Sequence, residues 1–403
     1  MSLDDKTLDR ILHRGTTEII VEEEFVRLLK RSEPLRLKMG FDPSSPDIHV
    51  GHAVGLRKLR QLQELGHKVI LIVGDWTARI GDPSGQSAIR KMLSAEEVEH
   101  NAQTYMQQLF KIVDRDRTEA VYQSEWFGEF DLERVIRLTS KFTVAQFLAR
   151  EDFNKRYREG RPIAVTELLY PLLQAYDSVA IRSDVEFGGT DQKFNLLVGR
   201  DLQIMEGQEP QQCFLVPLLV GTDGSQKMSK SLGNAIGVDD PPHEQYGKVM
   251  SLRDDLIVDY FNLLTDVESG ELQEMGRAME AGAVNPMELK KRLARDIVGQ
   301  FHDAEAAREA EAHFERVVQR GEAPEEMEPI DLAAITEKSL SHVLVAANLA
   351  SSIGQAKRLI KQGAVEINGQ KIAAENAAED LKPGDTLRAG KRRYVRIVGG
   401  GAS

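Results

Sequence analysis

Within the first 80 residues, the pattern of apolar and polar positions changes from strand-like to helical and back to strand-like. Residues 35–42 are largely apolar and lead into Gly40-Phe-Asp-Pro-Ser-Ser-Pro46, a cluster that is typical of a turn. Apolar side chains then recur at helical spacing over residues 52–64, up to Gly66, before the unbroken apolar run of residues 68–73. A strand, a helix and a buried strand in this order predict a βαβ unit of a doubly wound parallel sheet.

Strand and helix signals are unevenly distributed further along the chain. Strand-like apolar runs are predicted at residues 179–187 and 214–220, on either side of a predicted helix over residues 193–206. Helical spacing with many charges dominates the other long segments, which are residues 4–31, 86–165 and 240–318. We therefore expect a helical insertion inside the sheet domain and a separate helical domain after it.

These patterns predict an α/β fold. Its parts are a Rossmann-like doubly wound parallel sheet with a helical insertion, then an α-helical domain, and finally a small α+β domain. The predicted boundaries are residues 1–232 for the sheet domain (insertion at about 86–165), 233–320 for the helical domain, 321–338 for a Pro/Glu-rich linker and 339–403 for the last domain.

Composition narrows the class of protein. The chain has 403 residues, of which 41% are apolar and 29% charged, as in a soluble protein of two or three domains. No apolar run reaches the roughly 18 residues of a membrane-spanning helix, and the charged start predicts no secretory signal. The single cysteine, Cys213, excludes a disulfide framework and favours the cytoplasm. The nine histidines and this cysteine show no zinc spacing, so no metal held by the protein is predicted.

Charge is divided unequally between the body and the tail. The net charge is −12, yet residues 337–403 contain eleven Lys and Arg against six Asp and Glu, or +5, which leaves −17 for the rest. A basic tail on an acidic body is typical of a protein that contacts a polyanion through the tail.

The segment His49-Val-Gly-His52 stands where the first predicted strand passes into a helix. Free N–H groups and the positive dipole end of a helix N-terminus suit a triphosphate. Gly51 leaves room for a flat adenine ring against the backbone, and both imidazoles project from one side of the first turn, where they can donate to phosphate oxygens. Capping or surface histidines beside a turn glycine are the alternative interpretation.

A second segment, Lys227-Met-Ser-Lys-Ser231, follows a stretch with two glycines. Its lysines place positive charge on a mobile loop, which could close on the β- and γ-phosphates and stabilise the departing pyrophosphate. Ser229 and Ser231 can shape this loop through local hydrogen bonds. A solvated basic loop is the alternative.

Together, the two segments resemble the paired signature of class I aminoacyl-tRNA synthetases, which activate an amino acid with ATP and load it onto tRNA. Attack of the amino-acid carboxylate on the α-phosphorus needs no covalent nucleophile from the protein, and Mg²⁺ is expected to accompany ATP. The resemblance implies that the catalytic residues are His49, His52, Lys227 and Lys230. It also implies ATP contacts at Gly51, Met228, Ser229 and Ser231.

Three more segments are similar to tyrosyl-tRNA synthetases, namely Gly81-Asp-Pro-Ser-Gly85, Tyr170-Pro-Leu-Leu-Gln-Ala-Tyr-Asp177 and Gly188-Gly-Thr-Asp-Gln192. Residues 191–195 resemble the Thermus-type bacterial subgroup. On a helix, Tyr170, Gln174 and Asp177 share one face and could line a pocket.

That resemblance implies a role for each matching residue. Asp82, Tyr170 and Gln174 would hold the α-ammonium of tyrosine, and Asp177 would accept the phenol hydroxyl. Gln192 would lie near the reacting carboxylate, Gly189 and Asp191 would contact the ribose, and the role of Asp42 is left open.

Two positions depart from the family pattern. Lys38 stands where many members have a tyrosine that contacts the substrate hydroxyl, and our hypothesis is that Lys38 pairs with Asp177 and keeps it ionised. Gln86 stands where others have a lysine, whereas Arg90 matches the family's arginine. The transition-state clamp is therefore expected on Arg90, Lys227 and Lys230.

Residues 339–397 resemble an S4-type RNA-binding domain, with Val345-Ala-Ala-Asn-Leu-Ala350 and the basic stretch around Lys357 as matching parts. Phosphate neutralisation by its cations predicts salt-sensitive binding of tRNA. The cations in question are Lys357, Arg358, Lys361, Lys391, Arg392 and Arg393. The helical domain would recognise the anticodon by the same resemblance.

The insertion carries apolar positions that fit either a homodimer face, as the family implies, or interior packing. They are Val135, Ile136, Leu138 and Phe142. Three other functions compete with a tyrosine-specific enzyme: a tryptophanyl-tRNA synthetase, a synthetase-derived RNA-binding factor and a small nucleotidyltransferase that shares the His-x-Gly-His segment.

Overall fold

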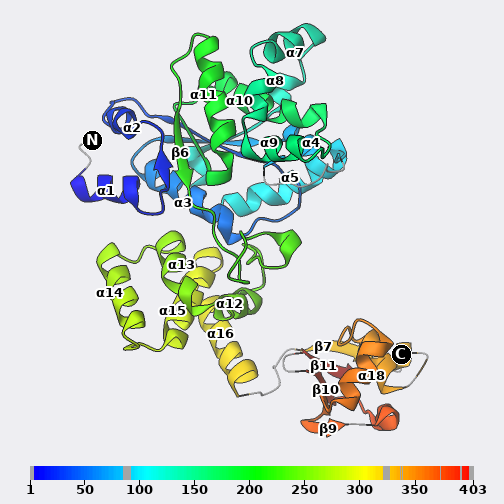
Figure 1. Cartoon of the computed structure of the whole chain (residues 1–403). Coiled ribbons are helices and arrows are strands. Elements are labelled where there is room, and N and C mark those ends of the chain that lie inside the picture. Colours follow the sequence, from blue (N-terminus) through cyan, green and yellow to red (C-terminus); the bar gives the residue numbers. More distant parts are fainter. Residues whose placement is uncertain are drawn as a thin grey trace. The chain divides into compact units, whose positions relative to one another are not determined.

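A computed structural model describes residues 4–84, 92–320, 327–335, 337, 339–372, 374–390 and 393–398 (Figure 1). The chain divides into two compact units, Met1–His302 and Asp303–Ser403. The predicted boundary at residue 232, within the first unit, stays a prediction. No helix in the described ranges is long and apolar enough to cross a membrane.

The first unit contains a six-stranded sheet with the order β1-β6-β5-β2-β3-β4. All neighbours are parallel except β1, which is antiparallel to β6. The strands are β1 Glu18–Ile19, β2 Arg36–Phe41, β3 Lys68–Val73, β4 Thr118–Tyr122, β5 Val185–Gly189 and β6 Gln212–Val216. Because the strand order reverses between β2 and β5, a ligand crevice is expected at the carboxyl ends of these two strands.

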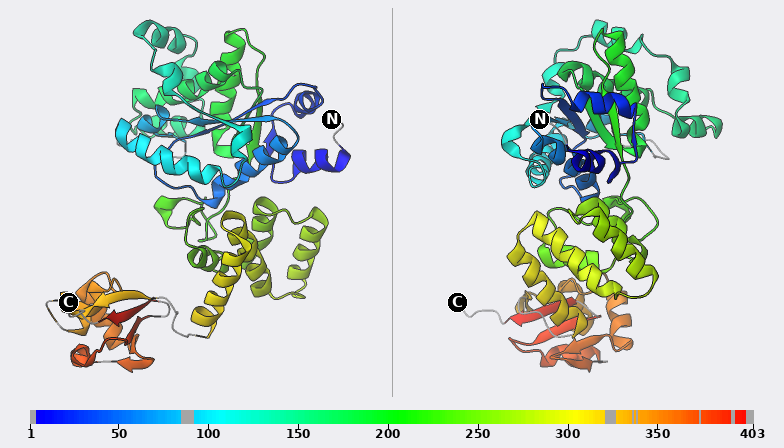
Figure 2. Two further views of the ribbon diagram at one scale, coloured as in Figure 1. Left: turned by 180° about the vertical axis from the view of Figure 1, so that it is seen from behind. Right: turned by 90° about the vertical axis from the view of Figure 1, so that its left-hand side faces the viewer.

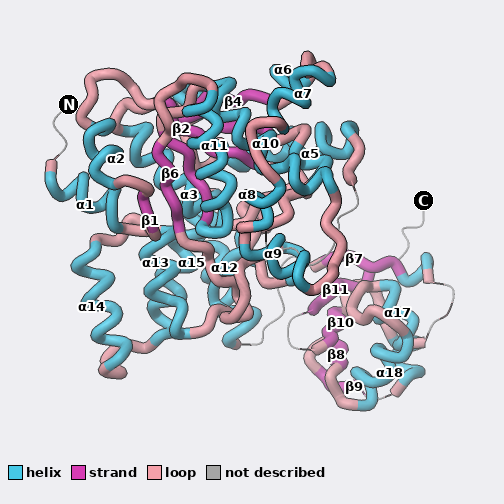
Figure 3. Tube along the Cα trace, turned by 45° about the horizontal axis from the view of Figure 1, so that its top comes forward, coloured by secondary structure: helices cyan, strands magenta, loops and turns pink. Residues whose placement is uncertain are grey.

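Helices cover both faces of this sheet, which confirms the predicted doubly wound fold (Figures 2 and 3). Helices α10 (Val165–Ile181) and α11 (Lys193–Met205) lie on one face, whereas α3 (Val50–Glu64) and α5 (Ala95–Leu109) lie on the other. Strand β3 is consequently buried from Val69 to Val73, which explains its unbroken apolar sequence.

Two cationic side chains, Lys58 and Arg14, connect α1 (Asp5–His13) and the residue after it to neighbouring helices. Lys58, from α3, donates to the carbonyls of Arg10 and Ile11 at the end of α1, at 2.9 Å each. Arg14 donates to four carbonyls in and just after the last turn of α13 (Ile257–Leu264), among them Thr265 O at 2.7 Å. Each cation donates to carbonyls at or just after a helix C-terminus, where intrahelical donors become scarce.

The remaining α-helices of the first unit range from four to 16 residues in length. They are α2 Glu22–Leu29, α4 Thr77–Ile80, α6 Ser124–Phe127, α7 Leu132–Thr139, α8 Val144–Leu148, α9 Glu151–Arg158, α12 Pro242–Met250, α13 Ile257–Leu264, α14 Ser269–Glu280 and α15 Pro286–Phe301.

The structure corrects the predicted strands at three places. Strand β4 lies inside the segment predicted to be a helical insertion, and only Val121 of this edge strand is buried, so it has no apolar run to reveal it. Helix α10 continues to Ile181, beyond the predicted start of the next strand at residue 179. The two-residue β1 lies within residues 4–31, for which only helices were predicted. Short and edge strands carry too few buried positions to show a period.

The second unit combines helices with a five-stranded sheet of order β7-β11-β10-β8-β9. Its core includes Leu344, Val365, Leu387 and Ile397. The elements are α16 Ala304–Phe314, β7 Glu328–Asp331, α17 Leu340–Ala346, α18 Ile353–Lys361, β8 Val365–Ile367, β9 Gln370–Ile372, β10 Thr386–Ala389 and β11 Arg393–Val398.

Four of the six cations predicted to contact RNA are exposed in this unit. Lys357, Arg358 and Lys361 lie on α18, and Arg393 begins β11, where its guanidinium donates to Leu349 O at 3.3 Å. Lys391 and Arg392 lie outside the described residues.

Candidate active site

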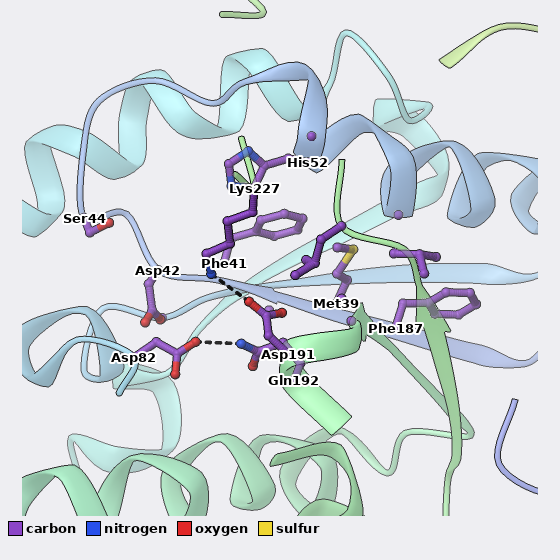
Figure 4. Close-up of a pocket in the computed structure, with 18 of the residues that line it drawn as sticks. Met39, Phe41, Asp42, Ser44, His52, Asp82, Phe187, Asp191, Gln192 and Lys227 are labelled. Atoms are coloured by element: carbon purple, nitrogen blue, oxygen red, sulfur yellow. Dashed lines mark hydrogen bonds and ion pairs between the residues drawn. The ribbon is translucent and has the colours of Figure 1, made fainter. Parts of the chain in front are cut away.

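A cavity of about 940 Å³ lies at the carboxyl ends of β2 and β5, where the strand order reverses (Figure 4). Both signature segments line it, through His49, Gly51 and His52 at the start of α3 and through residues 226–229 and Ser231 of the second segment. Residues of α10, of the loop after β5 and of the segments that follow β3, β4 and β6 also line it. The two segments, 178 residues apart in the chain, therefore face one shared crevice.

The two histidines stand against each other at the start of α3. His49 is the N-cap residue, the ring centroids of His49 and His52 lie 4.1 Å apart, and the N–H of His49 donates to His52 Nδ1 at 3.3 Å. Burial lowers the pKa of His49 to about 2 and that of His52 to about 4. Both imidazoles are neutral at pH 7, so each offers one N–H donor without the desolvation cost of a buried charge.

Gly51 has a packing role that the sequence did not reveal. A Cβ atom on this residue would lie 2.8 Å from Nδ1 of His49. Any larger residue would push the ring of His49 out of position, so the glycine sets the place of the histidine as well as opening the backbone to a ligand.

The segment 227–231, called the flap here, is anchored at its base. Met228 is buried and its N–H donates to Leu219 O at 2.8 Å, while the N–H of Ser229 donates to Asn234 Oδ1 at 2.8 Å. The hydroxyls of Ser229 and Ser231 lie 2.9 Å apart, as expected for serines that shape the loop.

Both flap lysines hold carboxylates at the cavity rim. Lys227 Nζ lies 3.0 Å from Asp191 (Figure 4), and Lys230 Nζ lies 2.5 Å from Asp47 beside a smaller cavity of about 360 Å³ that adjoins His49. Partly exposed pairs of this kind contribute roughly 0–1 kcal/mol each. A triphosphate could therefore draw either lysine away from its carboxylate at little cost.

Helix α10 presents Tyr170, Gln174 and Asp177 to the other end of the cavity. The hydroxyl of Tyr170 donates to Asp42 Oδ2 at 2.8 Å, and the hydroxyl of Thr77 donates to the second oxygen of Asp42 at 2.6 Å. Asp42, whose role the sequence left open, thus fixes the orientation of Tyr170.

Asp177 lies at the buried end of the cavity, 2% exposed. It accepts hydrogen bonds from Gln123 Nε2 at 2.8 Å and Trp126 Nε1 at 3.2 Å. Gln123 is itself fixed, since its Oε1 accepts from the N–H of Thr77 at 3.0 Å. Sequence reasoning missed Gln123 and Trp126 because they follow β4, the strand hidden in the predicted insertion.

Burial raises the pKa of Asp177 to about 8, against the opposing effect of the Lys38 ammonium. In the unfolded chain this group has a pKa of 3.8. Between about pH 4 and pH 8 it is therefore protonated in the folded protein but ionised in the unfolded chain. The free energy of unfolding contributed by this group is greatest in acid and decreases as the pH rises through that window.

Asp177→Asn removes the titration, so the stability of the variant relative to wild type should increase up to about pH 8. Urea unfolding of both proteins at several pH values measures this, and a difference independent of pH would contradict it.

A chain of amides connects α10 with the loop after β5. Asn195 Nδ2 lies 3.1 Å from both Gln174 Oε1 and Gln192 Oε1, and Gln192 Nε2 donates to Asp82 Oδ2 at 2.6 Å (Figure 4). The backbone N–H of Ser84 donates to the second oxygen of Asp82 at 2.8 Å. The cavity therefore gathers oriented acceptors suited to an ammonium group.

The hypothesis that Lys38 pairs with Asp177 is wrong. Lys38 is fully buried beneath the cavity lining and pairs with Glu186 at 2.9 Å rather than with Asp177. Strand pairing explains the difference, because Lys38 and Glu186 are direct neighbours on β2 and β5. Gln86 and Arg90 lie outside the described residues.

The apolar positions of the insertion separate into two groups. Leu138 is buried and Phe142 half-buried in a cluster with Phe147 and Phe153, whereas Val135 and Ile136 are exposed on α7. Further exposed apolar side chains are Leu132, at the start of α7, and Val144 and Val165, at the starts of α8 and α10. No cluster of three or more His, Cys, Asp or Glu side chains that could hold a metal ion occurs within the part of the chain that the structure describes.

Comparison with known proteins agrees with this geometry. Residues 30–319 match the family of class I tRNA synthetases (W and Y), and residues 340–387 match the S4 domain. The chain is 60% identical to a tyrosine–tRNA ligase of Dehalococcoides mccartyi (99% of this chain, 100% of the relative) and 51% identical to one of Thermotoga maritima (97% of each). The crystal structure of tyrosyl-tRNA synthetase from Archaeoglobus fulgidus, complexed with L-tyrosine, has a TM-score of 0.62 and 26% identity, over 75% of this chain and 98% of that one.

Proposed function

The chain belongs to the class I tRNA synthetases of the tyrosine and tryptophan type, and we propose that the cavity at β2 and β5 is its catalytic site. The enzyme is a tyrosine–tRNA ligase: it activates L-tyrosine with ATP to tyrosyl-adenylate and pyrophosphate, then transfers tyrosine to the 3′ end of tRNA(Tyr). The observation that carries the site assignment is the shared crevice of the two signature segments, with Asp177 buried at its far end.

ATP, which enters with Mg²⁺ as part of the substrate, would lie between the start of α3 and the flap. The neutral rings of His49 and His52 donate N–H groups toward the phosphates, at a helix N-terminus that favours anions. Lys227 and Lys230 exchange their carboxylate partners for phosphate oxygens and stabilise the charge that passes to pyrophosphate. We keep Arg90 as a further cation of this clamp, on the family resemblance alone. Gly189 and Asp191 lie beside the flap, where the ribose is expected.

Tyrosine would enter with its ammonium group toward Asp82, Tyr170 and Gln174. The phenol hydroxyl then forms a hydrogen bond with the carboxyl group of Asp177, which two fixed donors hold in place. Phenylalanine has no hydroxyl and would leave Asp177 without this third hydrogen bond. Tryptophan carries its N–H at a different position on its ring system from the hydroxyl of tyrosine, so the indole N–H would not reach the same place. Both physical arguments favour tyrosine over the runner-up, tryptophan.

The other parts of the molecule support handling of tRNA. In the S4-like unit, the exposed cations on α18 and at the start of β11 would contact phosphates of the tRNA. Helices α12–α15 would contact the anticodon. The exposed apolar stripe around Ile136 is proposed as the homodimer face, since apolar patches of this kind are characteristic of interfaces. A reaction on tRNA and a buried, unpaired Cys213 fit the cytoplasm.

Exchange of labelled pyrophosphate into ATP tests the proposed function. We expect exchange that depends on tyrosine, with neither tryptophan nor phenylalanine as an effective substitute, followed by charging of a bacterial tRNA(Tyr) transcript. Exchange driven by tryptophan would assign the other member of the family. Binding of RNA without any exchange would instead favour a synthetase-derived RNA-binding factor.

A further inference from the structure

A buried ion pair lies directly beneath the amino-acid end of the cavity. Lys38 and Glu186 are opposite each other on β2 and β5 and are 0% and 1% exposed. The ammonium of Lys38 has three protons and three acceptors, which are Glu186 Oε1 at 2.9 Å, Gln174 O at 2.9 Å and Ser178 Oγ at 2.7 Å. Burial of two charges gives little net stability, and this pair also contacts Gln174, which lines the cavity, so we seek a functional explanation in that contact.

Glu186 controls the direction of one amide that faces the substrate. Its Oε1 accepts from Gln174 Nε2 at 3.1 Å, and its Oε2 accepts from Gln211 Nε2 at 2.5 Å. A carboxylate only accepts hydrogen bonds, so the nitrogen of Gln174 must turn toward Glu186 and its oxygen away from it. An α-ammonium group only donates, and this orientation is the one that offers it an oxygen.

The effect continues along the amide chain. With Gln174 Oε1 as an acceptor, Asn195 must turn its Nδ2 toward it, and the same nitrogen contacts Gln192 Oε1. Gln192 is left with its Nε2 toward Asp82. Glu186 therefore directs the first of three amides in sequence. Arg150, which donates to Asn195 Oδ1 at 3.2 Å, and Asp82, which accepts from Gln192, favour the same directions in the other two.

We propose that Lys38 and Glu186 form a positioning pair that orients the amide of Gln174 and thereby sets the affinity for the amino-acid substrate. Glu186 gives the direction and Lys38 supplies the counter-charge that allows a carboxylate to stay beneath the cavity. This inference rests on the proposed function, because it takes the α-ammonium as the group that Gln174 binds.

Glu186→Gln is the direct test, since it keeps the shape but can offer an amide NH₂, which permits the amide of Gln174 to turn around. We expect KM for tyrosine in pyrophosphate exchange to rise about tenfold or more, while KM for ATP stays within about twofold. The double variant Lys38→Met/Glu186→Gln removes both charges. It should recover thermal stability that the single variant loses, yet keep the raised KM for tyrosine.

The pair Arg156–Glu167 offers a matched control. It is also buried, and Glu167 lies on the same helix α10 but outside the cavity lining. Glu167→Gln should lower the melting temperature with both KM values unchanged. An unchanged KM for tyrosine in folded Glu186→Gln, a parallel loss in both KM values, or restoration of KM in the double variant would each overturn the inference. Should the single variant fail to fold, the double variant decides by the same KM comparison. Wild-type protein without tyrosine-dependent exchange would instead refute the proposed function on which the inference rests.

Discussion

Asp177→Ala is expected to lower kcat/KM for tyrosine activation by about 100-fold or more. The change removes the buried acceptor of the phenol hydroxyl and leaves the N–H groups of Gln123 and Trp126 without their partner. Each unsatisfied buried polar group costs roughly 1–3 kcal/mol, and 1.4 kcal/mol corresponds to a factor of ten. Pyrophosphate exchange at varied tyrosine concentration measures the loss, and the preference for tyrosine over phenylalanine should fall with it.

Asp184→Ala serves as the control for Asp177→Ala. Asp184 is likewise an aspartate that accepts a hydrogen bond, from the N–H of Arg36 at 2.8 Å, but it directly precedes β5 and does not line the cavity. This variant should lose stability and retain the KM for tyrosine. Wild-type exchange in folded Asp177→Ala would refute the assignment of the phenol acceptor.

Lys230→Ala is expected to reduce kcat for adenylate formation by about 100- to 1000-fold, with little change in KM for tyrosine. The flap lysine contacts Asp47 in the free enzyme, and its catalytic interaction is made only with the phosphates as charge develops on pyrophosphate. An interaction confined to the transition state lowers kcat without weakening ground-state binding. Single-turnover formation of tyrosyl-adenylate separates the two quantities.

Lys193→Ala provides the matched control for Lys230→Ala. Lys193 also forms a partly exposed ion pair, with Glu18 at 2.7 Å, but unlike Lys230 it lines neither the main cavity nor the smaller one. Loss of this pair should change kcat by less than about twofold. An equal effect of the two substitutions, or an unaltered kcat in Lys230→Ala, would show that the flap does not act on the phosphates.

The amino-acid sequence alone identified the elements whose side chains repeat strongly. The apolar run 68–73 coincides with β3, and the periodic segment 52–64 lies within α3. The doubly wound sheet followed from these elements because a βαβ unit has one favoured hand and direction. The family resemblance then named His49, Lys230 and Asp177 from local motifs, which need no knowledge of distant contacts.

Only the tertiary structure decided which distant residues meet. The pairing of Lys38 with Glu186 depends on β2 and β5 becoming neighbours across 148 residues of chain, and no local pattern contains that register. The contact of Gln123 with Asp177 likewise depends on β4 joining the sheet at its edge, beside β3. Local sequence determines period and conformation, whereas the partner of a buried charge is fixed by packing, since every charge taken out of water must be paired where the fold places it.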